Sequence, residues 1–373
     1  MKSFFVVVRN TIVKFFYKTV FKQIFFLMDP ELVHSRAIKI GTILGASFLT
    51  RSFITLCFSY SNKILEREIL KIKFLNPVGL AAGFDKNAQL TALWPSVGFG
   101  FAEVGSITGE ACEGNPKPRL WRLKKSQSLV VNYGLKNEGS EKLSAKLRNI
   151  KFQIPIGTSI AKTNNKETVE TEQGIADYVK AFKQFSDIGS YFSINISCPN
   201  VFGGLPFTDD SKLDKLLGKL DQISTGKPIF IKISPDLSLD QVDKIIDVVK
   251  RHRVDGFICS NLTKNRVNKK IIDNKIPEAG GISGRAVEDL ANNLIGHIYR
   301  REKDRFVIIG CGGVFRAEDA YKKIKLGASL VQLITGMIYE GPQVISEINM
   351  GLVKLLKKDG FTNISQAVGS GVK

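Results

Sequence analysis

The chain has 373 residues, of which 43% are hydrophobic and 24% charged. This composition is typical of a folded globular protein and excludes a disordered, collagen-like or wholly membrane-embedded chain. The formal charge is +19 at pH 7, but the basic residues form no recognisable nucleic-acid-binding module, so we expect no nucleic-acid partner. Five cysteines without a CxxC pair and three histidines predict neither a disulfide framework nor a metal site.

The first 28 residues combine five basic residues with no acidic one, and most of the others are aromatic or aliphatic. A charge recurs at least every seven residues, whereas a membrane-spanning helix needs about 18 uncharged apolar residues. Lys14, Lys18 and Lys22 share one face of a helix, with phenylalanines around the rest. This pattern predicts a helix lying in a membrane interface and attracted to anionic lipid. A second apolar stretch, residues 37–58, predicts one or two further amphipathic helices; helices merely packed on the main domain are the alternative.

From residue 77 onward, short apolar runs alternate with helix-like segments. Such continuous runs are typical of strands buried on both faces, as in parallel sheets. Eight alternations in the remaining chain favour an α/β fold of the (β/α)8 TIM barrel type over an open sheet. The expected strands are 77–83, 101–106, 155–161, 191–197, 228–234, 255–260, 306–313 and 329–336. The expected helices lie near 88–97, 138–149, 174–187, 210–223, 238–252, 285–302, 316–326 and 341–357.

In such a barrel the active site lies in the loops that follow the strands. Polar residues or glycines stand at nearly every expected strand end, although any one of them has an ordinary explanation as a turn or a cap. These are Lys86, Ser106, Asn195, Cys198, Asn200, Lys232, Ser260, Asn261, residues 310–313, Thr335 and Gly336.

The last two strand ends are rich in glycine and predict a cradle for a phosphate. Lys232 ends a central strand, where a cation can stabilise the negative charge of a reduced flavin. The asparagines at 195, 200 and 261 supply amide donors and acceptors suited to a ring of alternating N–H and C=O groups. Cys198 lies between two of these asparagines and can act as a base if its pKa is lowered.

Together these motifs resemble the dihydroorotate dehydrogenase family, in particular its membrane-associated, quinone-linked class. The likeness covers nearly the whole chain. It is carried by DPELVH (29–34), NPVGLAAGFDKNA (76–88), EVGSIT (103–108), GNPKPRLWRL (114–123), NISCPN (195–200), IKISPDL (231–237), SNLT (260–263), GGISGR (280–285), IGCGGV (309–314) and GASLVQL (327–333).

The resemblance implies an enzyme of pyrimidine biosynthesis that oxidises dihydroorotate to orotate through FMN and passes the electrons to quinone. It assigns catalysis to Cys198, as the base, and to Lys86. The implied substrate residues are Lys86, Asn132, Asn195, Asn200 and Asn261, and His34 and Arg122 are implied for quinone. The implied FMN residues are Ala82, Gly83, Ser106, Ser159, Asn195, Lys232, Ser260, Gly284, Gly312, Gly313, Thr335 and Gly336.

The resemblance also implies a division into a membrane-associating extension, residues 1–65, and an FMN-binding barrel, residues 66–373. The extension would admit quinone from the lipid. We therefore expect a peripheral, monotopic protein, on the cytoplasmic face of the inner membrane if bacterial or at the mitochondrial inner membrane if eukaryotic.

Four positions depart from the pattern of the quinone-linked class. Cys198 stands where that class usually has serine, and Val131 stands where the family places a substrate-binding asparagine, with Asn132 one residue late. Ser159 replaces an asparagine near the flavin, and Leu262 replaces a hydroxyl residue near the substrate. Two alternatives stay open: a paralogous FMN oxidoreductase acting on a different ring, and a non-catalytic barrel that binds flavin or phosphate.

Overall fold

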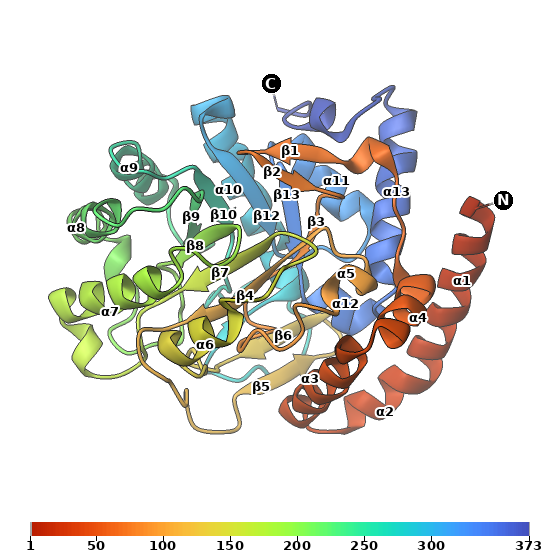
Figure 1. The fold of residues 1–373 in the computed structure, drawn as a ribbon, viewed down its shortest axis with the longest axis horizontal. Helices are drawn as coiled ribbons and strands as arrows, with labels where there is room; N and C mark the ends of the chain where they lie inside the picture. The colour runs from red at the N-terminus through yellow and green to blue at the C-terminus, as the bar shows by residue number, and fades with distance from the viewer. Residues whose placement is uncertain (1, 373) are drawn as a thin grey trace.

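Eight short apolar strands pair in parallel and close on themselves in the order β10-β12-β13-β3-β4-β7-β8-β9. They appear in a computed structural model that describes residues 2–372 (Figure 1). Each strand overlaps one of the eight expected apolar runs, and only β4 extends past its run, by one residue, so the predicted (β/α)8 barrel is confirmed. The barrel strands are β3 (Val78–Leu80), β4 (Phe101–Ile107), β7 (Ile156–Ile160), β8 (Tyr191–Asn195), β9 (Ile229–Ile233), β10 (Gly256–Cys259), β12 (Val307–Cys311) and β13 (Leu330–Leu333).

Eight helices of the outer layer follow the predicted order, whereas α12 was not predicted and begins inside the last expected strand. The members of the layer are α5 (Trp94–Val97), α6 (Ser140–Leu147), α7 (Thr171–Gln184), α8 (Asp210–Asp221), α9 (Leu239–Val249), α10 (Glu288–Glu302), α11 (Ala317–Lys325), α12 (Thr335–Glu340) and α13 (Val344–Lys358). Short 3-10 helices are Lys63–Leu65, Glu167–Val169, Pro206–Thr208, Gly284–Val287, Lys303–Arg305 and Ile364–Ala367.

The helix expected over 88–97 is reduced to α5 because a buried side chain organises the segment before it. Asp85 Oδ1 accepts from the N–H of Gln89 at 2.7 Å, and Oδ2 accepts from the N–H of Leu90 at 2.9 Å. These bonds hold residues 85–90 as a turn and keep them from helical pairing.

Two further sheets lie at opposite ends of the barrel (Figure 1). The antiparallel hairpin of β1 (Arg67–Ile69) and β2 (Ile72–Phe74) closes the end where the strands begin, over the buried rings of Phe101, Tyr191 and Phe230. The sheet β11-β6-β5, with β5 (Leu120–Leu123), β6 (Ser128–Val131) and β11 (Gly281–Ile282), stands beside the strand ends that carry the expected site. The sequence reading missed both sheets.

The extension consists of α1 (Lys2–Phe16), a π-helical turn (Tyr17–Phe21), α2 (Lys22–Leu27), α3 (Pro30–Ala46) and α4 (Phe48–Phe58). It rests on α12 and α13 through polar contacts. Arg9 Nη2 donates to Ser346 Oγ at 2.8 Å, Lys14 Nζ pairs with Glu347 at 3.1 Å, and Lys18 Nζ pairs with Glu340 at 2.6 Å. Arg9, Lys14 and Lys18 therefore face the barrel, because its carboxylates and the hydroxyl of Ser346 pair with them.

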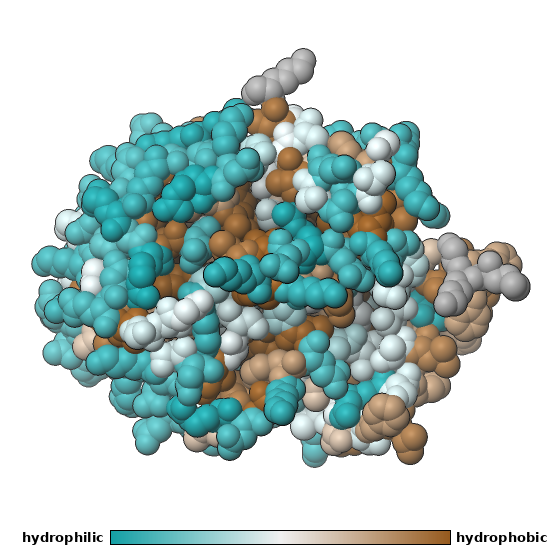
Figure 2. Space-filling view, turned by 45° about the horizontal axis from the view of Figure 1, so that its top comes forward, coloured by the Kyte–Doolittle hydropathy of each residue, from teal (hydrophilic) through white to brown (hydrophobic). Residues whose placement is uncertain are grey.

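In this arrangement the lysine face of the first helix is turned toward the barrel, and the attraction of the segment to anionic lipid stays a prediction. The phenylalanine face is exposed to solvent: Phe4 is 75% and Leu27 86% exposed, and Phe48 and Leu49 of α4 are exposed to a similar extent. Figure 2 shows apolar residues gathered on the right-hand side, where these helices lie. No single helix among residues 2–372 has the length and hydropathy of a bilayer span; α3 and α4 reach it only as a pair, bent by 112°.

Candidate active site

A cavity lies at the carboxyl ends of the barrel strands. The ends of seven of the eight strands line it, and only β7 does not. Residues of β5, β6 and the segments after β6 and β11 form its outer wall. The predicted residues that line it are His34, Ala82, Gly83, Lys86, Ser106, Asn195, Cys198, Asn200, Lys232, Ser260, Asn261, Gly284, Gly312, Gly313, Thr335 and Gly336.

Two strand-end asparagines satisfy each other across the floor of the cavity. Asn261 Nδ2 donates to Asn195 Oδ1 at 3.0 Å, and Asn195 Nδ2 donates to Ser106 Oγ at 2.9 Å. The third asparagine differs, because Asn200 Nδ2 donates to the carbonyl of Val131 at 2.8 Å while its buried Oδ1 finds no partner among residues 2–372. Since a buried acceptor without a partner costs about 1–3 kcal/mol, Asn200 is the amide most available to a ligand N–H.

Cys198 lines the cavity between the asparagines, in the loop that follows β8. Burial raises the pKa of its thiol to about 11, although the backbone of Asn200 and the positive charges of Lys232 and Lys162 act in the opposite direction. At neutral pH the thiolate needed for proton abstraction is therefore a minor species.

Lys86 brings a cation into the cavity from the loop after β3. Its Nζ lies 4.0 Å from the centre of the Tyr133 ring, and burial lowers its pKa to about 7. A ligand carboxylate placed here would restore the charged form, because its negative charge stabilises an ammonium group that burial has deprived of water.

The glycine-rich end of the cavity offers unpaired backbone donors. The N–H groups of Gly312, Gly313, Val314, Thr335 and Gly336 find no acceptor within residues 2–372. Glycine is required at 336, because a Cβ there would lie 2.0 Å from the carbonyl oxygen of Val314. Converging N–H groups of this kind bind phosphate.

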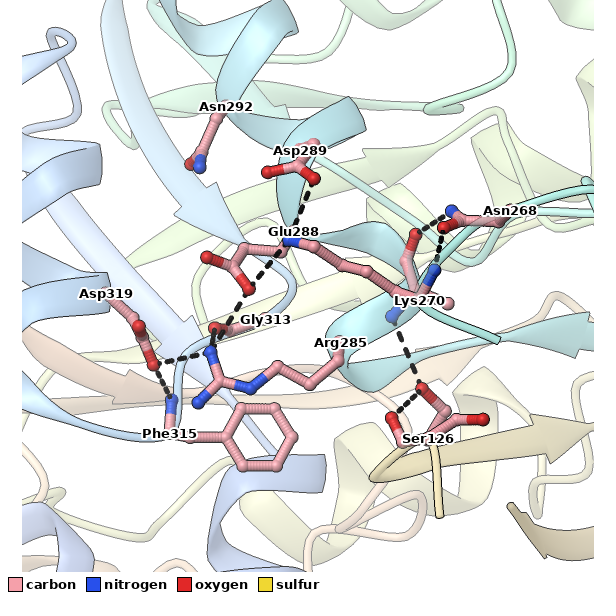
Figure 3. Close-up of polar contacts among 12 residues, drawn as sticks. Ser126, Asn268, Lys270, Arg285, Glu288, Asp289, Asn292, Gly313, Phe315 and Asp319 are labelled. Carbon is pink, nitrogen blue, oxygen red and sulfur yellow. Dashed lines mark hydrogen bonds and ion pairs between the residues drawn. The ribbon is translucent and has the colours of Figure 1, made fainter. Parts of the chain in front are cut away.

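The loops that carry these donors are held from behind by an ion-pair cluster (Figure 3). Arg285 Nη1 pairs with Asp319 at 2.9 Å and with Glu288 at 3.1 Å, and Lys270 also pairs with Glu288 at 3.1 Å. None of these four side chains lines the cavity.

Three predicted site residues lie outside the cavity wall. Asn132 points to a neighbouring surface hollow, where it accepts from Asn115 Nδ2 at 3.0 Å. Ser159 lies behind Ser106, and the two Oγ atoms are 2.8 Å apart. The Ser159 side chain is too short to extend past Ser106 to the cavity. The structure does not bring either residue to the cavity surface, and their roles stay unsupported predictions.

Arg122 is the third residue outside the wall. Its guanidinium lies 4.8 Å from the centre of the Phe26 ring, and its Nη1 donates to the carbonyl of Met28 at 2.8 Å. Phe26 packs edge-on against Tyr339, and the cavity ends at Leu120, Leu129 and Ile338 in the same apolar cluster.

His34 does line the cavity, on its α3 side. Its Nε2 lies 2.9 Å from the carbonyl oxygen of Phe84, and burial lowers its pKa to about 3. The ring is therefore neutral at physiological pH, with the proton on Nε2 because a carbonyl only accepts. A second hollow beside α3 shares His34, Phe84, Lys86, Tyr133 and Lys136 with the main cavity.

Sequence reasoning missed the residues that the sheet β11-β6-β5 and the segments after β6 and β11 contribute. Tyr133, Leu135 and Ser283 line the cavity, as do Val131 and Leu262, which the sequence singled out only as departures. A signal was present, because LWRL and SLVV flank the polar turn KKSQ in the manner of a hairpin.

Comparison with known proteins places this geometry in a family. The dihydroorotate dehydrogenase family model matches residues 64–356. The chain belongs to the dihydroorotate dehydrogenase family. Dihydroorotate dehydrogenase (quinone) of Gloeobacter violaceus is 37% identical over 93% of this chain and 97% of its own length. The enzyme of that name from Nostoc punctiforme is 38% identical over 92% and 94%.

Solved structures of the family have the same fold. DHODH from Eimeria tenella in complex with ferulenol superposes with a TM-score of 0.83 at 28% identity, over 92% of this chain and 95% of that one. The ligand-free form of the same protein gives the same TM-score and identity over 92% of this chain and all of the other. The resemblance seen in the sequence motifs is thus confirmed.

Proposed function

We propose that this chain is an FMN-dependent dihydroorotate dehydrogenase that oxidises dihydroorotate to orotate in pyrimidine biosynthesis and passes the electrons to quinone at a membrane surface. The observation that carries this function is the coincidence of a family match over residues 64–356 with one cavity that holds Lys86, Cys198 and Asn200 together. Residues 66–373 supply that site, and residues 1–65 act as the membrane-associating part.

FMN fits the cavity better than an unphosphorylated flavin. The unpaired N–H groups of Gly312, Gly313, Val314 and Gly336 suit a phosphate. Lys232, which is 5% exposed and lies at the carboxyl end of β9, suits the ring end, where negative charge develops on reduction. When bound, the flavin accepts the two electrons of the oxidation and later releases them to quinone.

The remaining wall fits a carboxylated dihydropyrimidine. Lys86 pairs with the substrate carboxylate, which keeps the lysine protonated, and Asn200 Oδ1 accepts from a ring N–H. Cys198 then removes the proton from C5 of dihydroorotate as the hydride leaves C6, so that the C5–C6 double bond of orotate forms. Lys232 and Lys162 favour the thiolate that this step requires.

Quinone access is assigned to the α3 side of the cavity. The hollow beside α3 leads from the lipid-facing extension to His34 and Phe84, which line both spaces. The exposed phenylalanine and leucine side chains of α1, α2 and α4 would insert into the acyl boundary and place this hollow at the membrane.

Anaerobic mixing of the detergent-solubilised protein with dihydroorotate tests the function. We expect the absorbance of the oxidised flavin to bleach and to recover when a short-chain quinone is added. A yellow protein that dihydroorotate does not bleach would contradict the substrate while retaining the cofactor.

A second candidate is a related FMN oxidoreductase that acts on a less polar ring. The supporting observation is that Val131, Leu135 and Leu262 line the cavity beside the asparagines, while the amides of Asn195 and Asn261 are bonded to protein groups. Bleaching by dihydrouracil, which lacks the carboxylate, but not by dihydroorotate would favour this candidate.

A further inference from the structure

The ion-pair cluster around Arg285 lies behind the glycine-rich loops. It marks the boundary between backbone N–H groups that have no acceptor and backbone N–H groups that have one. The N–H groups of residues 312–314 find no acceptor among residues 2–372, whereas those of Phe315 and Arg316 both donate to Asp319 Oδ2, at 3.0 and 3.2 Å. Asp319 is buried and pairs with Arg285 (Figure 3). The boundary between free and occupied donors is therefore set at Val314 by this cluster.

Arg285 also acts on the peptide just before that boundary. Its Nη1 lies 3.4 Å from the carbonyl oxygen of Gly313, and its guanidinium stacks 4.2 Å from the centre of the Phe315 ring. In a trans peptide the C=O and the following N–H point in opposite directions. A Gly313 carbonyl held toward Arg285, outside the cavity, therefore turns the N–H of Val314 toward the cavity that Val314 lines.

We propose that Arg285 is a positioning residue for the phosphate end of the flavin, because it orients the Gly313–Val314 peptide and locks it to Asp319. The side chain does not reach the cavity, and its charge is balanced by Glu288 and Asp319. Its effect is thus on the geometry of the N–H donors and not on direct phosphate binding. This inference rests on the proposed FMN site.

The test compares FMN with riboflavin, which carries the same ring but no phosphate. Flavin is removed from the full-length protein, and the dissociation constants of both ligands are measured by fluorescence quenching. For Arg285→Gln we expect FMN affinity to fall about tenfold, the value of one well-oriented hydrogen bond to a charged group, while riboflavin affinity is unchanged. Arg285→Lys, which keeps a donor near Gly313, should recover part of the loss.

Arg316 provides a matched control. Its Nε contacts the same carboxylate, Asp319, at 3.4 Å, but its side chain is 68% exposed and has no bond to Gly313. Arg316→Gln should leave both affinities unchanged. The double variant Arg285→Gln/Glu288→Gln also removes one of the two carboxylates with which Arg285 pairs, the other being Asp319, and it should remain weak for FMN.

Several outcomes would overturn the proposal. Parallel losses for FMN and riboflavin would mean a general loss of structure, and equal FMN affinity in wild type and Arg285→Gln would mean no role. Recovery of FMN affinity in the double variant would mean that repulsion by Glu288 caused the loss. A wild-type protein that binds neither flavin would instead contradict the proposed function.

Discussion

At the level of single residues, burial displaces the pKa values of two ionisable groups in the cavity. The two shifts act on different steps, because one concerns substrate binding and the other proton abstraction. Lys86 is easier to deprotonate than a free lysine, and Cys198 is harder to deprotonate than a free cysteine. The lysine must be charged to bind a carboxylate, whereas the cysteine must lose its proton to act as a base. Rising pH therefore weakens binding and accelerates proton abstraction.

For Lys86 we predict that the affinity for orotate falls as the pH rises above about 7. The free enzyme loses the ammonium charge through its pKa of about 7, so the dissociation constant should rise, approaching about tenfold per pH unit. Titration of the flavin spectrum with orotate from pH 6 to 9 measures this. Lys86→Met should bind weakly and without this pH dependence, whereas Lys136→Met, at the cavity rim, should keep it; a flat wild-type profile would contradict the prediction.

For Cys198 we predict that Cys198→Ala slows flavin reduction by dihydroorotate at least about 100-fold, the usual contribution of a positioned base. Flavin content should not change. In the wild type at saturating substrate, the rate of reduction should rise with pH from 7 toward 10, because the thiol pKa is raised to about 11. Stopped-flow bleaching measures both, and an unchanged rate in the alanine variant would remove Cys198 from the base role.

At the scale of elements, the extension presents its charges inward and its aromatic face outward. Arg9, Lys14 and Lys18 contact α12, α13 and the end of α4, and Lys22 lies 5.2 Å from the centre of the Tyr339 ring. We therefore expect apolar insertion to supply more of the proposed membrane affinity than the net charge of the segment does.

We predict that binding to lipid vesicles depends on the exposed leucines more than on lipid charge. Leu27→Ser with Leu49→Ser should weaken binding clearly, since both side chains are more than three-quarters exposed. Val267→Ser, which removes an equally exposed apolar side chain from a barrel loop, is the matched control. Anionic lipid and salt should have small effects; a gain of about 1 kcal/mol for each basic residue of α1 and α2 in anionic vesicles would contradict this orientation.

At the scale of the whole molecule, the barrel and the extension meet through a polar face and an apolar one. Ser346, Glu340 and Glu347 bind basic residues of the extension, whereas Ile38, Leu44 and Ile54 pack into the hydrophobic core of the barrel, so a barrel without the extension exposes both kinds of group there. A shortened chain should begin at Ser61, because a start at Lys71 would remove Leu65, which is fully buried, and β1.

We predict that the chain beginning at Ser61 folds, retains flavin and is still bleached by dihydroorotate. It should lose binding to vesicles and most of its rate with a long-chain quinone, because the hollow beside α3 loses one wall. Sedimentation with vesicles and quinone-dependent reoxidation measure these properties. Full activity with a vesicle-embedded quinone would show that the extension is not the access route.

The barrel and most of the cavity wall follow from the order of residues alone. Parallel strands buried on both faces must be continuously apolar, and their carboxyl ends must converge, so residues such as Lys86, Asn195, Cys198 and Lys232 could be placed without coordinates. The contacts that each side chain makes depend on the tertiary structure. Phe26 covers Arg122, Asn132 turns outward, the lysines of the extension pair with α12 and α13, and Arg285 sets the free donors of the glycine loops. These outcomes depend on contacts between segments far apart in the chain, and the local periodicity of the sequence does not predict such contacts.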